Sequence, residues 1–345
     1  MTNVISQRSN EDWVMYHGDC CEVVDGIPDN SIGLSVHSPP FSSLYIYSDS
    51  ENDMGNCQSD EEFFKHYKFL IPKLLRVTIP GRLAAVHCKD LPRYANRDGT
   101  AGLKDFPGQV IAAFESCGWS YHSRVTIWKC PVTERERTNN NGLLHKTAER
   151  DRSQLRQGMA DYLVVFRRPP TGTLMSDEPV AWKEDAKNAI REYVGEVDPS
   201  ENANHPSPFA RKKQSPQAHG RSIDIWRRYA EPVWWDINQT NVLGGKHGGI
   251  DYRKGREAND ERHICPLQLD VIERCVQLWS NPGDVVLSPF AGIGSEGYVA
   301  VKLERKFIGI ELKKSYYEVA CSNLKAGVEV SREGKFQFEE MEILP

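Results

Sequence analysis

The chain has no cysteine pair of the C-x-x-C type, and its nine cysteines are scattered apart from the adjacent Cys20 and Cys21. An odd number of cysteines without paired spacing argues against a disulfide framework and against a cysteine-rich zinc site. We therefore expect free thiols in a reducing compartment and no bound metal.

Long apolar runs are also missing. No stretch of 18 or more apolar residues occurs, so the sequence predicts no membrane span. The N-terminal segment, MTNVISQRSNEDW, is polar and lacks the apolar centre of a signal peptide. With 39% hydrophobic and 26% charged residues, the chain is predicted to be a globular protein of the cytoplasm.

An overall excess of basic charge is lacking as well, because 43 Lys and Arg stand against 48 Asp and Glu, for a net charge of −5. Binding of a polyanion needs only a local basic patch. Residues 205–230 carry such a patch, with six basic residues against the single acid Asp224. The six are Arg211, Lys212, Lys213, Arg221, Arg227 and Arg228. A solvated surface is the alternative interpretation.

Short apolar runs of strand type alternate with longer helical patterns over most of the chain. Strands are predicted at 14–17, 32–37, 83–87, 124–128, 162–167, 284–288 and 307–311, and helices at 61–77, 106–116, 266–279, 296–303 and 315–325. This alternation predicts an α/β fold with a doubly wound, mostly parallel, Rossmann-like sheet. Two polar stretches interrupt it: a surface arm at 132–158 and a larger insertion at 169–262, expected to lie outside the sheet.

A glycine turn follows the predicted strand 284–288, in the segment SPFAGIGSE. Glycines there let the backbone pass close to a ligand, and the helix that follows points its N-terminus at it. About twenty residues later, the next strand ends in Glu311, a carboxylate suited to binding two ribose hydroxyls. The chain lacks both the third glycine of G-x-G-x-x-G and a phosphate-binding G-x-x-x-x-G-K-[ST] loop, so triphosphate binding is disfavoured.

The predicted strand 32–37 runs into Ser38-Pro39-Pro40-Phe41. Two prolines stiffen this loop and hold its carbonyls in set directions. The Ser38 hydroxyl and a proline carbonyl can accept both hydrogens of an –NH₂ group, while Phe41 offers a flat face for a base.

These two segments resemble motifs IV and I of the DNA amino-methyltransferases, in the order of the permuted β group of that family. Gly18-Asp19 resembles its adenine-contacting segment, and the run from His263 through Pro266 resembles the segment near the methionine end of the cofactor. Ser288 and Glu296 depart from the family's usual Asp and Thr. The resemblance implies S-adenosyl-L-methionine as cofactor, bound by Asp19, His263, Pro266, Ser288, Phe290, Gly292, Gly294 and Glu311.

The resemblance also implies the division of the chain. Residues 13–168 form the catalytic half of the methyltransferase domain, 169–262 the target-recognition insertion, and 263–330 the cofactor-binding half. The expected partner is double-stranded DNA, contacted by the basic patch. A cognate restriction endonuclease is a further candidate partner, no membrane is expected, and the protein is expected to be a monomer or a homodimer.

The expected reaction is direct methyl transfer to an exocyclic amino group of a flipped base, with Ser38, Pro39, Pro40 and Phe41 as the catalytic loop. No cysteine follows a proline in this loop, which disfavours carbon methylation through a thiolate. Ser38 in the first loop position favours cytosine N4 over adenine N6. Methylation of RNA or of a protein amide, and a catalytically silent nucleic-acid-binding protein, are the alternatives.

Three smaller features allow two interpretations each. Segment 45–56 is either a lid over the flipped base or an ordinary polar loop. Asp19 either contacts the cofactor or caps a turn. His37 and His87 end predicted strands, and we expect both to be residues at the edge of the core.

Overall fold

A computed structural model describes residues 4–41, 53–132, 145–171, 229–244 and 266–341. Its main sheet is formed by strands in the order β1-β2-β11-β10-β3-β4-β8-β7-β9. These are β1 (Ser6–Ser9), β2 (Trp13–His17), β11 (Lys306–Glu311), β10 (Val285–Ser288), β3 (Ile32–His37), β4 (Thr78–Lys89), β8 (Asp161–Arg167), β7 (Ser120–Ile127) and β9 (Val233–Trp234).

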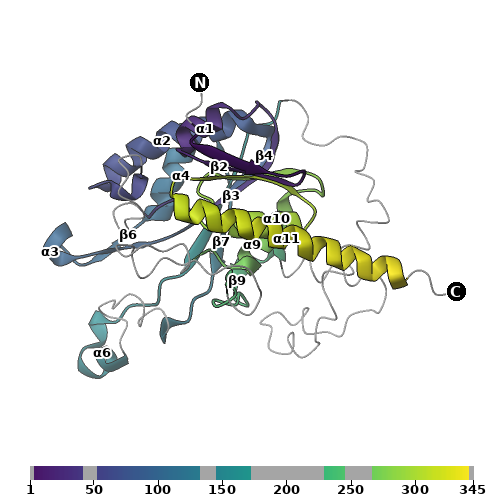
Figure 1. The fold of residues 1–345 in the computed structure, drawn as a ribbon. Helices are drawn as coiled ribbons and strands as arrows, with labels where there is room; N and C mark the ends of the chain where they lie inside the picture. Colours follow the sequence, from purple (N-terminus) through teal and green to yellow (C-terminus); the bar gives the residue numbers. More distant parts are fainter. Residues whose placement is uncertain (1–3, 42–52, 133–144, 172–228, 245–265, 342–345) are drawn as a thin grey trace.

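The central strands β2, β11, β10, β3 and β4 are parallel, β1 pairs antiparallel with β2, and β8 pairs antiparallel with both β4 and β7. Helices cover both faces (Figure 1). One core layer holds α1 (Cys20–Asp25), α2 (Asp60–Val77) and α4 (Phe106–Ser116), and the other holds α9 (Leu269–Trp279), α10 (Ser295–Lys302) and α11 (Lys314–Met341). The prediction of a doubly wound, mostly parallel sheet is confirmed.

Every predicted strand and helix has a counterpart. Strand 32–37 and helix 106–116 have the predicted bounds, and β4 is the largest difference among the strands, since it begins at Thr78. Helix α11 extends beyond the predicted 315–325 because its apolar stripe continues past Leu324 to the buried Val328. The N-cap of α2 is Ser59, whose hydroxyl accepts from the Glu62 amide.

The described part of the predicted insertion, residues 229–244, was expected to lie outside the sheet, and this was wrong for its strand β9. Val233 and Trp234 pair in parallel with the end of β7, and the Trp234 side chain is completely buried. Its indole N–H donates to the Tyr229 carbonyl. Burial of this large aromatic ring removes apolar surface from water, which stabilises the pairing of the segment with the sheet.

Two short segments project from the carboxyl edge of the parallel strands. One is the hairpin β5 (Leu91–Arg93) and β6 (Gly102–Lys104) with α3 (Ala95–Asp98) between them, and it follows β4 directly. The other contains α6 (His145–Arg150) and the 3₁₀ turn η3 (Arg152–Gln154), between β7 and β8. Figure 1 shows both on the left, the side on which α11 begins. The short turn η2 (Met54–Asn56) precedes α2.

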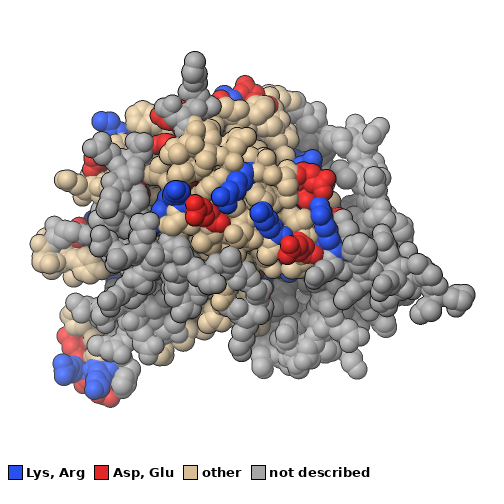
Figure 2. Space-filling model, viewed as in Figure 1, with Lys and Arg blue, Asp and Glu red and all other residues tan. Residues whose placement is uncertain are grey.

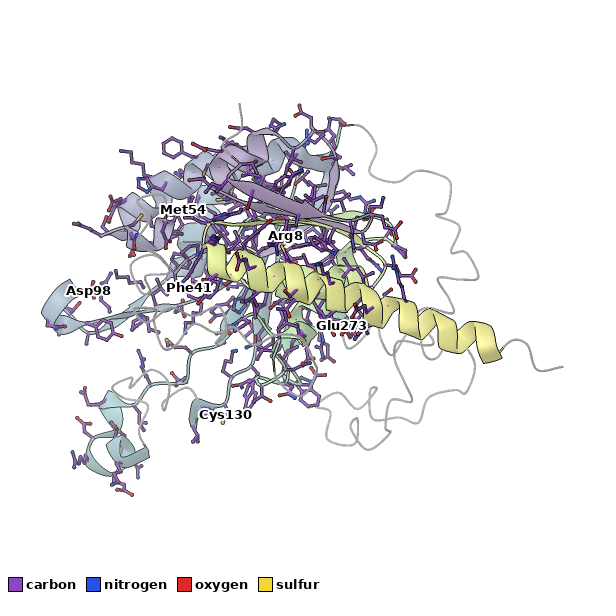
Figure 3. The ribbon with its side chains drawn as sticks, viewed as in Figure 1. Arg8, Phe41, Met54, Asp98, Cys130 and Glu273 are labelled. Carbon is purple, nitrogen blue, oxygen red and sulfur yellow. The ribbon has the colours of Figure 1, made fainter. Side chains whose placement is uncertain are left out.

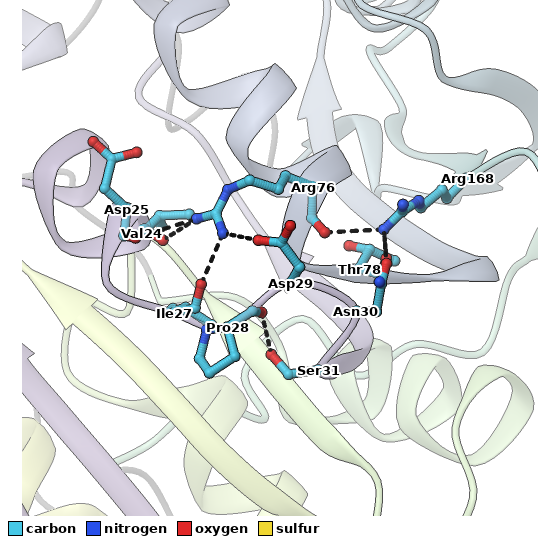
Figure 4. A network of polar contacts seen from close by, with 10 residues as sticks. All are labelled: Val24, Asp25, Ile27, Pro28, Asp29, Asn30, Ser31, Arg76, Thr78 and Arg168. Atoms are coloured by element: carbon cyan, nitrogen blue, oxygen red, sulfur yellow. Dashed lines mark hydrogen bonds and ion pairs between the residues drawn. The ribbon is translucent and has the colours of Figure 1, made fainter.

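At the opposite edge of the sheet, two arginines donate hydrogen bonds to backbone carbonyls (Figure 4). Arg76 on α2 donates to the carbonyls of Val24 and Ile27 and pairs with Asp29. Arg168, just after β8, donates to Asn30 Oδ1 and to the carbonyls of Arg76 and Thr78. These bonds tie the turn before β3 to the end of α2 and to the start of β4, and so help to set where β3 enters the sheet.

The exposed face of α11 carries both signs of charge. Figure 2 shows basic and acidic side chains alternating along this helix. They come from the exposed residues Lys314, Glu318, Lys325, Glu329 and Arg332. Mixed charge of this kind favours a solvated face over a polyanion-binding one. None of the helices among the described residues is both long and apolar enough to cross a membrane.

Candidate active site

The candidate site lies where the winding direction of the sheet reverses, between β10 and β3. Leu34 pairs with Val286 and Ser35 with Leu287, so both strands leave the sheet at the same level. Ser38 follows β3 and Phe290 follows β10, and the rings of His37 and Phe290 lie 5.8 Å apart. Ligands of doubly wound sheets bind at such a switch point, beyond the carboxyl ends of the strands.

Ser38 is partly exposed, and Pro39 behind it is buried. The Ser38 hydroxyl oxygen lies 3.3 Å from His87 Nδ1 and 3.4 Å from the His87 carbonyl oxygen. His87 Nε2 in turn lies 3.2 Å from Asp161 Oδ2, and Lys129 Nζ lies 2.7 Å from the same oxygen. A chain of polar contacts therefore runs from the loop that begins at Ser38 into the protein.

The four residues of this chain come from four segments: the ends of β3 and β4, the residues after β7 and the start of β8. Alternation along each strand directs their side chains toward the face covered by α9 and α10, as for the core residues Leu34, Ala85 and Leu163. His87, Asp161 and Lys129 are each less than 10% exposed. Burial raises the pKa of Asp161, but its contacts with His87 and Lys129 outweigh that effect and hold the pKa well below its usual range.

Phe41 is partly buried beside the serine. Its ring centroid lies 6.4 Å from that of His87 and 6.2 Å from that of Phe106, the latter in an edge-on arrangement. Lys89 Nζ lies 6.0 Å from the ring centroid. Figure 3 shows Phe41 and Met54 toward the end of the sheet at which α11 begins.

His37 supports the site from the other face of the sheet. It is completely buried, its Nε2 lies 2.8 Å from the Tyr67 hydroxyl, and its Nδ1 lies 3.3 Å from Ser35 Oγ. Burial lowers the pKa of His37 to about 3, so the ring is neutral. Tyr67 and His37 both contact the Phe290 ring, which agrees with the expected role of His37 as a core-edge residue.

The loop after β10 is shaped by two glycines with positive φ, +52° at Gly292 and +84° at Gly294. Gly294 is the N-cap of α10, and a side chain there would meet Ala320 of α11 at 3.1 Å. Asn323 on α11 donates to the Ile293 carbonyl at 2.8 Å. A Cβ on Gly292 would meet nothing within 4 Å, so the described residues leave space above this loop.

Glu311 ends β11 next to this loop. Its Oε2 accepts from the Gly292 amide at 2.8 Å, and its Oε1 accepts from the Lys313 amide at 2.9 Å. Burial raises the pKa of Glu311 to about 7; the two amide bonds act against this rise, and the charge of Asp53 adds to it. Asp53, Met54 and Gly55, at the described end of segment 45–56, are buried.

Ser288 and Glu296, the two departures from the family motif, are both buried. Ser288 Oγ has no hydrogen-bond partner among the described residues. Burial raises the pKa of Glu296 to about 8, and the nearby Glu311 adds to the rise. Two further polar atoms lack partners in the described part of the chain. They are Ser295 Oγ, next to Glu296, and Gln268 Oε1, at the start of α9.

Asp19 follows β2 at the same edge, and its Oδ1 accepts from the Cys21 amide at 2.6 Å as the N-cap of α1. Of the two interpretations offered for Asp19, helix capping therefore accounts for its Oδ1 atom. Pro266 is partly buried and leads into α9. His263 lies outside the described residues, as do all six residues of the basic patch 205–230.

The family model described as DNA methylase, for N6 and N4 methyltransferases, matches residues 32–322. The chain belongs to this family. It is 26% identical over 309 residues to the type II methyltransferase M.BglII of Bacillus subtilis, covering 89% of this chain and 67% of the relative.

Solved structures of the same fold were also found. The Thermus thermophilus protein TTHA0409, in complex with S-adenosyl-L-methionine, superposes with a TM-score of 0.57 at 19% identity, over 91% of this chain and 93% of that one. PvuII DNA methyltransferase, described as cytosine-N4-specific, gives 0.55 at 14% identity, over 96% and 95%. At these identities the likeness shows the fold alone.

The site fits the family's methyl donor, S-adenosyl-L-methionine. The space above Gly292 and the Ser288 hydroxyl, which has no partner within the described ranges, border the carboxyl end of β10, and Glu311 stands at the neighbouring strand end. A ligand with ribose hydroxyls and a polar amino-acid end matches these groups.

Asp161 and Lys129 were not predicted as site residues from the sequence, and His87 was expected to be a core-edge residue. A signal was present, since all three stand at the end or start of apolar strands with the same alternation as Ser38. Which strands are neighbours, however, is a property of the sheet order.

Proposed function

We propose that this DNA methylase transfers a methyl group from S-adenosyl-L-methionine to N4 of a flipped cytosine at a specific DNA site. The observation that carries the proposal is the meeting of Ser38-Pro39-Pro40-Phe41 with the glycine loop after β10 at the switch point. When bound, the cofactor supplies an electrophilic methyl group. The chain's own residues must present the acceptor nitrogen.

An exocyclic amine is a weak nucleophile because its lone pair is delocalised into the ring. Ser38 Oγ and the Pro39 carbonyl are suited to accept its two hydrogens, which favours a pyramidal nitrogen with a directed lone pair. Pro39 is buried and Pro40 partly so, hence the loop is held before the base arrives. Positioning of this kind is worth about 7–11 kcal/mol in favourable cases.

Phe41 provides the stacking surface. Phe106 and Lys89 contact its ring, and the residue keeps partial exposure for a base. Extruding a base costs a few kcal/mol, and stacking on an aromatic ring offsets roughly 1–3 kcal/mol of it.

Duplex DNA fits the surroundings of the site. The hairpin β5–β6 and the segment around α6 both project from the edge that carries Ser38, and the segment of α6 and η3 exposes Lys146, Arg150 and Arg152 together with the acids Glu149 and Asp151. These cations, with the basic patch 205–230, are suited to phosphates on either side of a flipped base.

The choice of cytosine rests on Ser38 in the first position of the loop, and adenine N6 is the alternative. The test is transfer of tritiated methyl groups to unmethylated duplex DNA, RNA and protein, followed by digestion and nucleoside chromatography. N4-methylcytosine supports the proposal, and N6-methyladenine would replace it with the alternative. Label in RNA or protein only, or cofactor binding without any transfer, would overturn it.

The catalytic loop is tested in the same assay. Ser38→Ala and Phe41→Ala are expected to lose at least about 100-fold in transfer rate, because each removes a group that positions the base. Tyr121→Phe, an exposed residue at the start of β7, is the control and is expected to match the wild type. Single-molecule sequencing of DNA from expressing cells would report the modified base and its sequence context.

A further inference from the structure

The polar chain behind Ser38 has the order hydroxyl, imidazole, carboxylate, ammonium, and each link is within 3.3 Å. We infer that Ser38, His87 and Asp161 form a buried proton relay, with Lys129 as its counter-charge, that removes the proton released by the target amine. This inference rests on the proposed function. It assigns a role to three residues outside the Ser-Pro-Pro-Phe motif.

The direction of the relay follows from charge. Asp161 is buried against the ammonium of Lys129, which keeps the carboxyl ionised, so Asp161 Oδ2 can only accept a hydrogen bond. His87 Nε2 must then carry the hydrogen in that contact. In the neutral ring, Nδ1 is left as an acceptor, and it faces the Ser38 hydroxyl.

Lys129 explains why the imidazole can be neutral at rest. Its ammonium lies 2.7 Å from the Asp161 oxygen that His87 also contacts at 3.2 Å. The buried carboxylate is thus balanced by a lysine, and needs no protonated histidine for charge balance. His87 therefore keeps a lone pair available for a proton.

Methyl transfer and proton removal balance in atoms and charge. The base nitrogen forms its bond to the methyl carbon while the carbon–sulfur electron pair stays with sulfur. The nitrogen releases one hydrogen as a proton to Ser38 Oγ, and the Ser38 hydroxyl proton passes to His87 Nδ1. The resulting imidazolium is stabilised by Asp161, and it returns its proton to solvent after the product leaves.

The contact with His87 also orients the Ser38 hydroxyl. When its hydroxyl hydrogen points at His87, the remaining lone pairs of Oγ face away from the imidazole and are available to the amine. The His87 carbonyl at 3.4 Å offers the same hydrogen a second acceptor on the same side. His87 is in this respect a positioning residue for Ser38.

The main test uses single-turnover methyl transfer to duplex DNA with His87→Gln. General-base assistance contributes about 10²–10⁴-fold, so the rate is expected to fall at least about 100-fold. Affinity for S-adenosylhomocysteine, measured by calorimetry, is expected to stay at the wild-type value. His122→Gln is the matched control, because His122 is exposed on β7 at the opposite edge of the sheet.

A double variant separates the relay from a structural role. Ser38→Ala retains a residual rate because the Pro39 carbonyl still accepts one hydrogen. If His87 acts through Ser38, the variant Ser38→Ala/His87→Gln is no slower than Ser38→Ala alone. Losses that multiply, or a wild-type rate for His87→Gln, would overturn the relay. Absence of transfer by both the wild type and His122→Gln would instead overturn the proposed function and, with it, the relay.

A measurement on the unmodified protein covers the case in which substitution disturbs folding. Nitrogen NMR of histidine-labelled protein is expected to show His87 as the neutral tautomer with hydrogen on Nε2, assigned by the signal lost in His87→Gln or His87→Asn. Hydrogen on Nδ1 would leave the imidazole unable to accept the Ser38 proton and would contradict the proposal.

Discussion

The backbone amide of Gly292 donates a hydrogen bond to Oε2 of Glu311 at 2.8 Å. This contact joins the loop after β10 to the end of β11, and it holds the carboxylate at the edge where the family's cofactor binds. The Lys313 amide holds the other oxygen at 2.9 Å. The carboxylate is thus oriented before any ligand arrives, which reduces the ordering required on binding.

Glu311→Gln is expected to weaken binding of S-adenosylhomocysteine about 10- to 150-fold, because a hydrogen bond to a charged acceptor contributes about 1.5–3 kcal/mol. The carboxyl has a pKa of about 7, so the wild-type affinity should rise as pH increases through that value and the acid ionises. Calorimetry at about pH 6 and about pH 8 checks both. An affinity of Glu311→Gln equal to that of the wild type would remove Glu311 from the cofactor site.

Glu296→Gln tests the buried carboxyl on α10. The folded pKa of about 8 exceeds the usual 4.5, so the unfolded chain loses this proton first and stability falls as pH rises from 4.5 to 8. The amide variant escapes this loss and should be more stable than the wild type above that window, by at most about 5 kcal/mol. Urea unfolding across that range measures it. Glu318→Gln, on the exposed face of α11, should show no such trend.

Tyr67→Phe is expected to destabilise the protein by about 1–3 kcal/mol, because it removes the hydroxyl that pairs with the buried His37 Nε2. Thermal unfolding is the measurement. Tyr121→Phe removes the hydroxyl of a residue that is 42% exposed and should leave the melting temperature unchanged. Equal melting temperatures for the two variants would show that the His37 contact contributes little.

Gly297→Ala is expected to destabilise the fold by about 1–3 kcal/mol through overpacking. Its Cβ would lie 2.4 Å from a Leu324 methyl carbon and 2.5 Å from the Phe307 ring. Gly102→Ala is the matched control, since a Cβ there meets nothing within 4 Å. Denaturant unfolding of both variants decides the matter, and a Gly297→Ala variant as stable as Gly102→Ala would mean that α10 and α11 shift apart freely.

Neutralising Arg211, Lys212 and Lys213 together tests the basic patch. If these residues contact phosphates, the slope of log affinity against log salt should fall by about 2.7, at roughly 0.9 per contact. Fluorescence anisotropy with duplex DNA at several salt concentrations measures the slope. A triple alanine variant of Lys306, Lys325 and Arg332 makes the same charge change away from the site; an equal fall in slope there would argue against a specific contact.

Much of the fold was predictable from the sequence, because local hydrophobic periodicity predicts strands and helices, and glycine and proline mark where they end. The resemblance to the family motifs also identified the two loops that meet at the candidate site. Residues 229–244 were misjudged because the wider stretch 169–262 is polar, whereas Trp234, Ile237 and Leu243 within it are buried in the core and β9 joins the sheet.

The loop Ser38-Pro39-Pro40-Phe41, the glycine turn and Glu311 could be recognised in the sequence, since these are local patterns whose chemistry can be interpreted residue by residue. The alignment of His87, Asp161 and Lys129 behind Ser38 became visible only in the folded sheet. These residues are separated by up to 123 positions from Ser38 to Asp161. Strand order in a sheet depends on long-range packing, and no local propensity encodes which strand ends become neighbours.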